Sequence, residues 1–262
     1  MALKEDLVIV EQQEIAKGIF SLILEGDMVK SMSCGQFVHI RVPDQSMVLR
    51  RPLSISQIDT AARQCRLIYR VEGRGTDYFS KMTVGQTLDV LGPLGKGFPT
   101  DFLEKGRAVL LVGGGIGVPP LVQVAKEAAQ KGCRVLSVIG FAHKDAVILE
   151  EELSTYGDVL VTTDDGSYGQ EGTVAKVIDN LKEDFQAIYS CGAAGMLVYL
   201  DKTFQDHPHA YLSLEGRMAC GTGACYACVV KPKQGKKHEN VRVCKEGPVF
   251  ETGSLSLLGG KA

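Results

Sequence analysis

The sequence lacks the features that would point to nucleic acid, to a membrane or to secretion. Its 29 Lys and Arg against 31 Asp and Glu leave a formal net charge of −2, so no basic field attracts nucleic acid. Its most apolar region, residues 108–125, is broken by glycines and prolines and falls short of the roughly 20 apolar residues that a membrane-spanning helix needs. The first residues show no apolar core behind a basic start. We therefore expect no nucleic-acid or membrane partner and predict a cytoplasmic protein.

The sequence also shows no arrangement typical of acid–base or nucleophilic catalysis. No Ser/His/Asp set and no pair of carboxylates stands out. The five histidines are scattered and are interpreted as solvated or loop residues: His39, His143, His207, His209 and His238. A reaction that depends mainly on positioning two reactants needs no such dyad.

Two regions of different character make up most of the chain. Residues 1–102 hold short β-type runs at 7–10, 19–24, 37–42, 66–71 and 88–91, separated by turn residues. Such spacing predicts a closed antiparallel β-barrel, with one short helix at 76–81. Residues 103–214 alternate buried strands with helices, which predicts a five-stranded parallel sheet built from right-handed βαβ units. The expected strands are 108–112, 135–141, 159–163, 187–190 and 210–214, and the expected helices are 121–131, 147–154, 174–181 and 196–204.

The remaining residues, 215–262, are rich in glycine and cysteine and are too few to build an apolar core of their own. A bound metal centre commonly stabilises a segment of this kind. Four of the eight cysteines lie here, namely Cys220, Cys225, Cys228 and Cys244. Their spacing, C-x4-C-x2-C followed after fifteen residues by C, is the plant-type spacing of a [2Fe–2S] cluster. A structural zinc site is the alternative, although zinc sites usually show C-x2-C pairs on both sides. Cys34, Cys65 and Cys133 are interpreted as ordinary apolar residues.

A glycine-rich turn follows the first predicted strand of the second region. Gly113, Gly114, Gly115 and Gly117 stand between that strand and a helix, where a phosphate can approach the backbone and the helix N-terminus. Pro120 occupies the place of the last glycine in the usual fingerprint, and a plain tight turn is the alternative. Asp145, after the second strand, is either a ribose-binding carboxylate or a solvated loop charge.

Three weaker motifs gain weight from their order along the chain. The first is Arg51-Pro52-Leu53-Ser54, in which the planar fork of the arginine can hold a pyrophosphate. The second is Gly75-Thr76, which opens a helix and can bind phosphate. The third is Cys191, at the end of the fourth βα strand, where a ligand of an open α/β sheet is expected. Small residues packing a turn are the alternative for this last position.

Together these motifs resemble the ferredoxin–NADP reductase superfamily. Residues 51–54 look like its Arg-x-Tyr-Ser flavin motif, with Leu53 in place of the tyrosine. Residues 113–120 look like its pyridine-nucleotide turn, and Cys191-Gly192 looks like its Cys-Gly pair near the nicotinamide. The resemblance implies an FAD-binding barrel at 1–102, an NAD-binding domain at 103–214 and a [2Fe–2S] domain at 215–262. It also implies FAD contacts from Arg51, Pro52, Leu53, Ser54, Ile68, Tyr69, Arg70, Gly75 and Thr76.

Within that superfamily the chain most resembles the electron-transfer subunits of class 1B dihydroorotate dehydrogenases. The matching stretches are 50–54, 92–98, 163–169, 218–225 and 243–250. This resemblance implies an NAD-linked oxidoreductase subunit without an orotate site, acting in pyrimidine biosynthesis. Its partner would be an FMN-containing catalytic subunit, in a heterotetramer of two of each. Electrons would pass from that FMN through [2Fe–2S] and FAD to NAD, with Cys191 near the hydride path.

Two alternatives remain open at this point. The first is the flavoprotein subunit of an NAD(P)H–ferredoxin or sulfide dehydrogenase, which has the same build. Fold alone does not separate it from the dihydroorotate reading. The second is a protein-interaction module that is stabilised by zinc and retains a reductase fold without its activity. Such a protein would be colourless, whereas a flavoprotein with an iron–sulfur cluster absorbs visible light.

Overall fold

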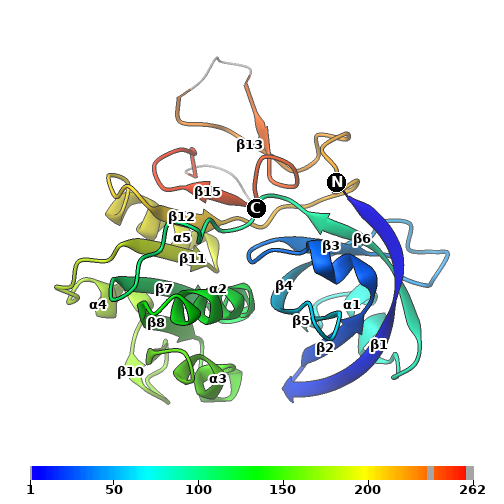
Figure 1. Cartoon of the computed structure of the whole chain (residues 1–262), viewed down its shortest axis with the longest axis horizontal. Helices are drawn as coiled ribbons and strands as arrows, with labels where there is room; N and C mark the ends of the chain where they lie inside the picture. Colours follow the sequence, from blue (N-terminus) through cyan, green and yellow to red (C-terminus); the bar gives the residue numbers. More distant parts are fainter. Residues whose placement is uncertain (1, 235–238, 258–262) are drawn as a thin grey trace.

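A computed structural model describes residues 2–234 and 239–257, so His238 lies outside the described residues. A β-barrel, blue to cyan in Figure 1, stands beside an α/β body that is green to yellow. The orange and red C-terminal segment runs across one end of both. None of the helices in the described part of the chain is long and apolar enough to span a membrane.

The barrel closes in the strand order β1-β2-β5-β4-β3-β6, and all its pairings are antiparallel. Alternate residues of these strands point inward, as the two-residue period of a strand requires, and Leu7, Leu22, Ile40, Leu67 and Val90 are all fully buried in its core. The elements are β1 (Leu3–Ala16), β2 (Ile19–Glu25), η1 (Asp27–Ser31), β3 (Phe37–Ile40), β4 (Arg51–Asp59), β5 (Gln64–Arg70), α1 (Arg74–Ser80) and β6 (Thr87–Leu94).

Strand β4 is the barrel element that the sequence did not reveal. The other five strands and the short helix are confirmed, with shifted ends. Proline cannot donate a hydrogen bond to a neighbouring strand. The charged Arg51 and the proline Pro52 at the start of β4 therefore gave this segment no strand signal in the sequence. In the fold Pro52 lies opposite His39 of β3, and Ser54 lies opposite Phe37. The flavin motif of the sequence is therefore the first part of a barrel strand.

The second body is a seven-stranded sheet in the order β10-β9-β8-β7-β11-β12-β15. All five predicted strands are present and parallel. The predicted number is nevertheless too small, because β10 adds two residues at one edge and β15 adds an antiparallel strand at the other. The strands are β7 (Ala108–Gly114), β8 (Arg134–Phe141), β9 (Asp158–Thr163), β10 (Gln170–Glu171), β11 (Ala187–Cys191), β12 (Ala210–Ser213) and β15 (Val249–Glu251).

Helices cover both faces of this sheet, and all four predicted helices are present with shifted ends: α2 (Pro119–Gln130), α3 (Glu150–Ser154), α4 (Val174–Ile178) and α5 (Ala194–Thr203). Short 3-10 turns, η2 (Gly115–Gly117) and η3 (Lys144–Ala146), follow β7 and β8. Pro119 and Pro120 start α2 because the first helical turn needs no donor from them. The C-terminal segment adds a small ladder of β13 (Val229–Val230) and β14 (Val241–Arg242).

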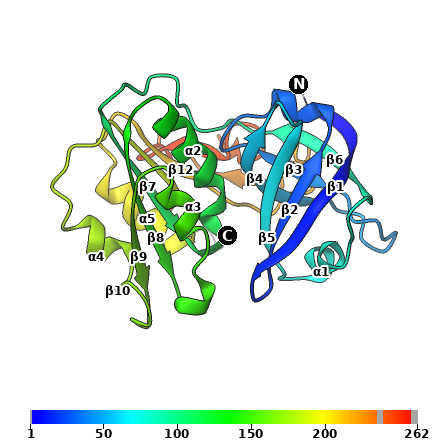
Figure 2. The ribbon, with the colours of Figure 1, turned by 60° about the horizontal axis from the view of Figure 1, so that its bottom comes forward.

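The barrel and the sheet are joined through α2 and α3, which lie between them in Figure 2. The backbone N–H of Ile58 in β4 donates to Gln123 Oε1 of α2 at 3.0 Å. Arg66 of β5 forms an ion pair with Glu152 of α3 at 2.6 Å, and Gln57 donates to the same carboxylate. Because Arg66 and Glu152 are mostly buried, this pair is screened less than one at the open surface.

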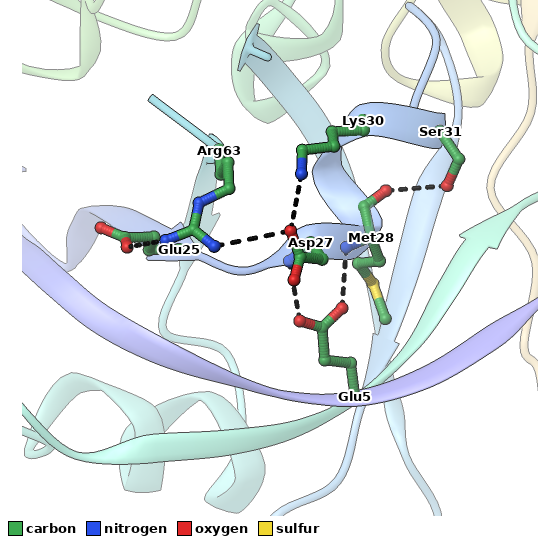
Figure 3. A network of polar contacts seen from close by, with 7 residues as sticks. All are labelled: Glu5, Glu25, Asp27, Met28, Lys30, Ser31 and Arg63. Carbon is green, nitrogen blue, oxygen red and sulfur yellow. Dashed lines mark hydrogen bonds and ion pairs between the residues drawn. The ribbon is translucent and has the colours of Figure 1, made fainter. Parts of the chain in front are cut away.

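A second polar network fixes the start of the chain on the barrel (Figure 3). The carboxylate of Glu5 accepts hydrogen bonds from the N–H groups of Asp27 and Met28, each at 2.7 Å. These are the first N–H groups of η1, which no backbone carbonyl of the turn could satisfy. Arg63 links Glu25 to Asp27, and Lys30 pairs with Asp27 at 2.8 Å. The network holds β1 to the β2–η1 corner.

Replacing Glu152 with alanine will lower the thermal unfolding midpoint. The change leaves Arg66 and Gln57 without their shared partner across the two bodies. We expect a cost of about 1 kcal/mol, which is a fall of roughly 2–4 °C for a chain of this size. Circular dichroism during heating measures it. Glu151→Ala is the matched control, since it removes the same charge from the same helix turn without touching the barrel. An equal fall in both variants would contradict an interdomain role for Glu152.

Candidate functional site

A cavity of about 480 Å³ opens where the barrel, the sheet and the C-terminal segment meet. From the barrel it is lined by eight of the nine residues expected to contact FAD: Arg51, Pro52, Leu53, Ser54, Ile68, Tyr69, Arg70 and Thr76. Ile116 and Ser213 line it from the sheet body, and Glu215, Arg217 and Met218 line it from the C-terminal segment. The structure thus brings together residues from β4, β5 and α1 that the family resemblance implied as FAD contacts.

The ninth residue, Gly75, lies beneath Arg51 instead of on the cavity wall. A Cβ atom at Gly75 would collide with Arg51 Nε and would lie 2.9 Å from Arg51 Cζ. Glycine at this position therefore makes room for the guanidinium. Arg51 Nη1 donates to the Leu49 carbonyl at 2.6 Å, and its charge forms no ion pair within residues 2–234 and 239–257. A positive charge held in this way suits an anionic ligand.

Tyr69, one of the residues that line the cavity, carries a buried polar atom that lacks a partner. Tyr69 is 2% exposed, and its hydroxyl makes no hydrogen bond to any described residue. Burial raises the pKa of Tyr69, so the hydroxyl stays protonated. Its ring stacks on Phe20 at 5.8 Å, which fixes its direction. An unsatisfied buried hydroxyl and an arginine without an ion-pair partner both fit a polar, anionic cofactor such as FAD.

A second cavity, of about 580 Å³, lies at the carboxyl ends of the sheet strands, where open α/β sheets bind ligands. Gly114, Gly115 and Gly117 line it, as expected for the nucleotide turn. Gly115 has a φ of +54° and faces open space, so a ligand can approach its backbone. Gly113 is buried instead, and a Cβ there would meet Val118 at 2.7 Å. Three of the four predicted glycines thus face this cavity.

The sequence left Asp145 open as either a ribose-binding carboxylate or a solvated loop charge, and the carboxylates that line the second cavity are those of Asp164 and Glu215. Asp145 lies on η3 and is not among the residues lining the cavity, whereas Asp164, directly after β9, lines it. A signal for Asp164 was present, because it follows the third parallel strand at the same sheet edge. Asp145, by contrast, follows the second strand.

Cys191 lies at the carboxyl end of β11, but its side chain is 2% exposed and does not line either cavity. Burial, with a smaller contribution from Glu215, raises the pKa of the Cys191 thiol to about 12. The thiol is therefore protonated near neutral pH. The Cys191-Gly192 turn packs tightly on Gly117, so the cysteine shapes the floor beneath the nucleotide turn. Its place near a hydride path stays a prediction.

Three residues line both cavities: Arg70, Ile116 and Glu215. Any ligands that fill the two cavities must meet at these side chains. Burial and the nearby charge of Glu72 raise the pKa of Glu215, while Arg70 acts in the opposite direction. Of the three, only Arg70 was predicted from the sequence. Glu215 could have been found by its place just beyond β12, at the same carboxyl edge.

The four predicted ligand cysteines lie in two pairs on neighbouring loops. The Cys225 N–H donates to Cys220 Sγ at 3.4 Å, and the Cys244 N–H donates to Cys228 Sγ at 3.4 Å. Gly221 and Gly223, with φ of +71° and +85°, let the first loop curl back on itself. Two pairs of thiols match a binuclear cluster, in which each of two irons takes two protein sulfurs.

The charges around these thiols fit a bound anionic cluster. Burial raises the pKa of Cys220, but the N–H groups of Cys225 and Thr222 outweigh it and lower that pKa to about 6. Burial and the neighbouring Cys228 thiol raise the pKa of Cys244 to about 12. Backbone N–H groups aimed at sulfur are what stabilises the negative charge of an iron–sulfur centre. No group of three or more His, Cys, Asp or Glu side chains in the described residues is arranged around a single metal ion.

Arg242 holds the two cysteine loops together. Its Nη1 donates to the Gly223 carbonyl at 2.9 Å, and its Nε donates to Glu246 at 2.9 Å. The guanidinium also lies 4.8 Å from the centre of the Tyr226 ring. The hydrogen bonds from Arg242 lower the pKa of Glu246 to about 2. One side chain thus connects the loop carrying Cys220 and Cys225 to the loop carrying Cys244.

The prediction for His39 was wrong. This residue was interpreted as a solvated or loop histidine, but it lies in β3 and is 0% exposed. Burial and the nearby charge of Arg50 lower its pKa to about 4. The residue was missed because an isolated histidine in a strand gives no sign of which face it occupies. His143 is exposed, and His207 and His209 are partly buried in the loop between α5 and β12, so the prediction holds for these three.

Comparisons with known proteins match the three regions in order. Residues 6–98 match the profile of the oxidoreductase FAD-binding domain, and residues 111–202 match that of the oxidoreductase NAD-binding domain. Residues 215–256 match the iron–sulfur cluster binding domain of dihydroorotate dehydrogenase B. Fold and site therefore define an oxidoreductase that uses FAD, NAD and an iron–sulfur cluster. The match of residues 215–256 to an iron–sulfur domain also decides against the zinc alternative for the cysteine segment.

Relatives of the same length narrow the class to one family. The dihydroorotate dehydrogenase B (NAD(+)) electron transfer subunit of Streptococcus mutans is 58% identical over 98% of this chain and 100% of its own. The subunit of the same name from Enterococcus faecalis is 46% identical over 97% and 98%. The chain belongs to the family of dihydroorotate dehydrogenase B electron transfer subunits.

Solved structures agree with the fold. An NADH-dependent reduced ferredoxin–NADP oxidoreductase superposes with a TM-score of 0.84 at 29% identity, over 96% of this chain and 90% of its own. A ferredoxin–NADP+ reductase from Neisseria gonorrhoeae with bound FAD and NADP gives a TM-score of 0.64 at 15% identity, over 79% and 92%. The second likeness concerns the fold alone.

Replacing Gly75 with alanine will weaken FAD binding by at least about tenfold, because the new methyl group pushes Arg51 out of place and hydrogen bonds to charged groups contribute roughly 1.5–3 kcal/mol. Quenching of FAD fluorescence by the apoprotein measures the affinity. Gly73→Ala is the matched control, because a Cβ there meets no atom within 4 Å. Unchanged affinity in the Gly75 variant would mean that Arg51 does not hold the flavin.

Replacing Cys225 with serine will remove most of the cluster. The wild-type chain should contain about two irons and absorb in the visible region as an iron–sulfur protein. The variant should lose the cluster absorption and most of the iron while keeping the flavin spectrum. Cys133→Ala, outside the cysteine loops, should change neither. Full iron content in the Cys225 variant would remove that residue from the ligand set.

Proposed function

We propose that this chain takes electrons from an FMN-containing dihydroorotate dehydrogenase catalytic subunit and delivers them to NAD+. The observation that carries this proposal is that the cysteine loop, the first cavity and the second cavity adjoin one another in that order. The cysteine loop begins two residues after Met218, which lines the first cavity, and the first cavity shares three lining residues with the second. A cluster, a flavin and a nicotinamide bound there would lie in that order.

The role of each group follows from the chemistry of the cluster, the flavin and the nicotinamide. When bound, the cluster supplies one-electron transfer, and the flavin connects single electrons to the hydride that a nicotinamide accepts. The protein positions these groups and excludes water between them, which is most of what a hydride transfer needs. The apolar side chain of Ile116 and the opposed charges of Arg70 and Glu215 stand where the two ligands meet.

The site assignments are part of the same proposal. Arg51 and Thr76 bind the phosphates of FAD, Ser54 lies near its ring, and Gly114 to Gly117 bind NAD. Cys220, Cys225, Cys228 and Cys244 hold the cluster. The proposed domains are residues 1–102 for FAD, 103–214 for NAD and 215–262 for the cluster. Two copies of this chain would assemble with two catalytic subunits in the cytoplasm, and the complex would serve pyrimidine biosynthesis.

A second candidate function is oxidation of NAD(P)H with ferredoxin as the partner. It is favoured by the structural likeness to the NADH-dependent reduced ferredoxin–NADP oxidoreductase. The relatives that are 46–59% identical are instead named for dihydroorotate dehydrogenase B, which makes the first function the stronger proposal. The two differ only in the redox partner of the cluster, because the flavin and nicotinamide ends would be the same.

Dihydroorotate will reduce the flavin of this chain only in the presence of the catalytic subunit and an intact cluster. Anaerobic mixing of the complex with dihydroorotate and NAD+ should produce NADH. The Cys225→Ser variant should lose at least about 99% of that rate, a change of roughly 2.7 kcal/mol in the barrier. Reduction of its flavin by NADH should stay within about twofold, because that step bypasses the cluster.

The outcome separates the two candidates. Failure of dihydroorotate to reduce the wild-type flavin, together with fast reduction of ferredoxin by NADH, would establish the second function. Loss of NADH-dependent flavin reduction in the Cys225 variant would mean that the cluster lies between FAD and NAD, contrary to the proposed order.

A further inference from the structure

His39 stands on the outer face of the barrel wall, against the cysteine segment. Its strand neighbours Val38 and Ile40 point into the barrel core, so Phe37 and His39 point outward. Phe37 packs in one apolar cluster with Cys228 and Cys244. Along the sheet, His39 lies opposite Pro52, which lines the flavin cavity. The residue thus stands between the flavin strand and the loops that carry the cluster cysteines.

The ring of His39 is in direct contact with the first cysteine loop. A Cβ atom at Gly221 would lie 2.6 Å from His39 Nδ1 and 3.3 Å from its Cε1. Gly221 is the residue that follows Cys220, and its φ of +71° turns the loop at this point. Only glycine lets the loop come this close to the ring, and the nearest ring atom is the nitrogen Nδ1.

Neither nitrogen of this fully buried ring has a hydrogen-bond partner among the described residues. The backbone groups of Cys220 and Arg50 lie nearby without completing a hydrogen bond. An unsatisfied buried donor costs roughly 1–3 kcal/mol, so such a group in a folded protein calls for an explanation. An imidazole carries at least one N–H donor in either protonation state. Of the two nitrogens, Nδ1 faces the cysteine loop, so an acceptor for Nδ1 would lie on that loop.

We propose that His39 is a positioning residue of the iron–sulfur centre, whose Nδ1–H donates a hydrogen bond to a sulfur at the Cys220–Gly221 turn when the cluster is bound. The inference rests on the proposed [2Fe–2S] cluster, but not on the identity of the redox partner. A donor to sulfur stabilises the more negative, reduced cluster and so raises its reduction potential. The same contact holds the cluster loop to the strand next to the flavin-binding residues.

Two substitutions in the full chain, purified with FAD and cluster, separate this role from simple packing. His39→Leu keeps most of the bulk and removes the donor. We expect the equilibrium constant for reducing the cluster to fall by about tenfold, which is about 59 mV for one electron. His39→Asn places an amide N–H close to the position of Nδ1 and should restore the constant to within about threefold. His39→Gln reaches toward the Nε2 position instead and should restore less.

Electron spin-echo spectroscopy of the reduced cluster in protein labelled with 15N-histidine gives a readout independent of activity. A 15N coupling should be present in the wild-type chain, absent in His39→Leu and unchanged in His143→Asn, which removes an exposed histidine of the sheet body. An unchanged potential together with an unchanged spectrum in His39→Leu, at full iron content, would reduce His39 to a packing residue. If His39→Leu fails to retain its cluster, the proposal is tested on the wild-type spectrum alone. The absence of any 15N-histidine coupling in that spectrum overturns the proposal. None of these measurements involves dihydroorotate, so the proposed redox partner could be wrong while this inference holds.

Discussion

The stretch Gly247–Glu251 holds the cysteine segment against both larger bodies of the molecule. On the barrel side, the Lys96 N–H donates to the Gly247 carbonyl at 2.6 Å. On the sheet side, the Leu214 N–H donates to the Pro248 carbonyl at 2.9 Å, and β15 pairs with β12. Cys244 lies only three residues before this tie. The position of the cluster relative to the flavin and nucleotide cavities is therefore fixed mainly by backbone hydrogen bonds.

This tie makes the first cavity a product of all three parts of the chain. Arg51 and Tyr69 come from the barrel, Ile116 comes from the sheet body, and Met218 and Pro248 come from the C-terminal segment. A ligand bound among them contacts all three parts and stabilises their arrangement by mass action. The ion pair of Arg66 and Glu152 also joins the barrel to the sheet body. Binding of the cofactor and the arrangement of the three parts are therefore thermodynamically coupled.

The sequence predicted the parts of the site whose chemistry lies in short spacings. The cysteine loop, the glycine turn and the residues around Arg51 were found because each motif is local and needs particular residue types. Strand β4 was missed because Pro52 and two arginines hide a strand that only its barrel neighbours stabilise. Glu215 and Asp164 were missed because they matter only through the edge at which parallel strands end. The extra strand β15 joins the sheet from far along the chain, and no local pattern reveals such a pairing.

His39 shows why burial is the hardest part of a site to predict. Its neighbours in sequence do not distinguish a solvated histidine from one at 0% exposure, because the face it occupies depends on whether the barrel wall is covered. The cover is supplied by Gly221, 182 positions later, and it exists because Gly221 has no side chain to hold the loop away. A long-range contact of this kind also explains how a barrel residue can act on a cluster bound in another part of the chain. The barrel is then more than a flavin scaffold, since its outer face completes the surroundings of the iron–sulfur centre.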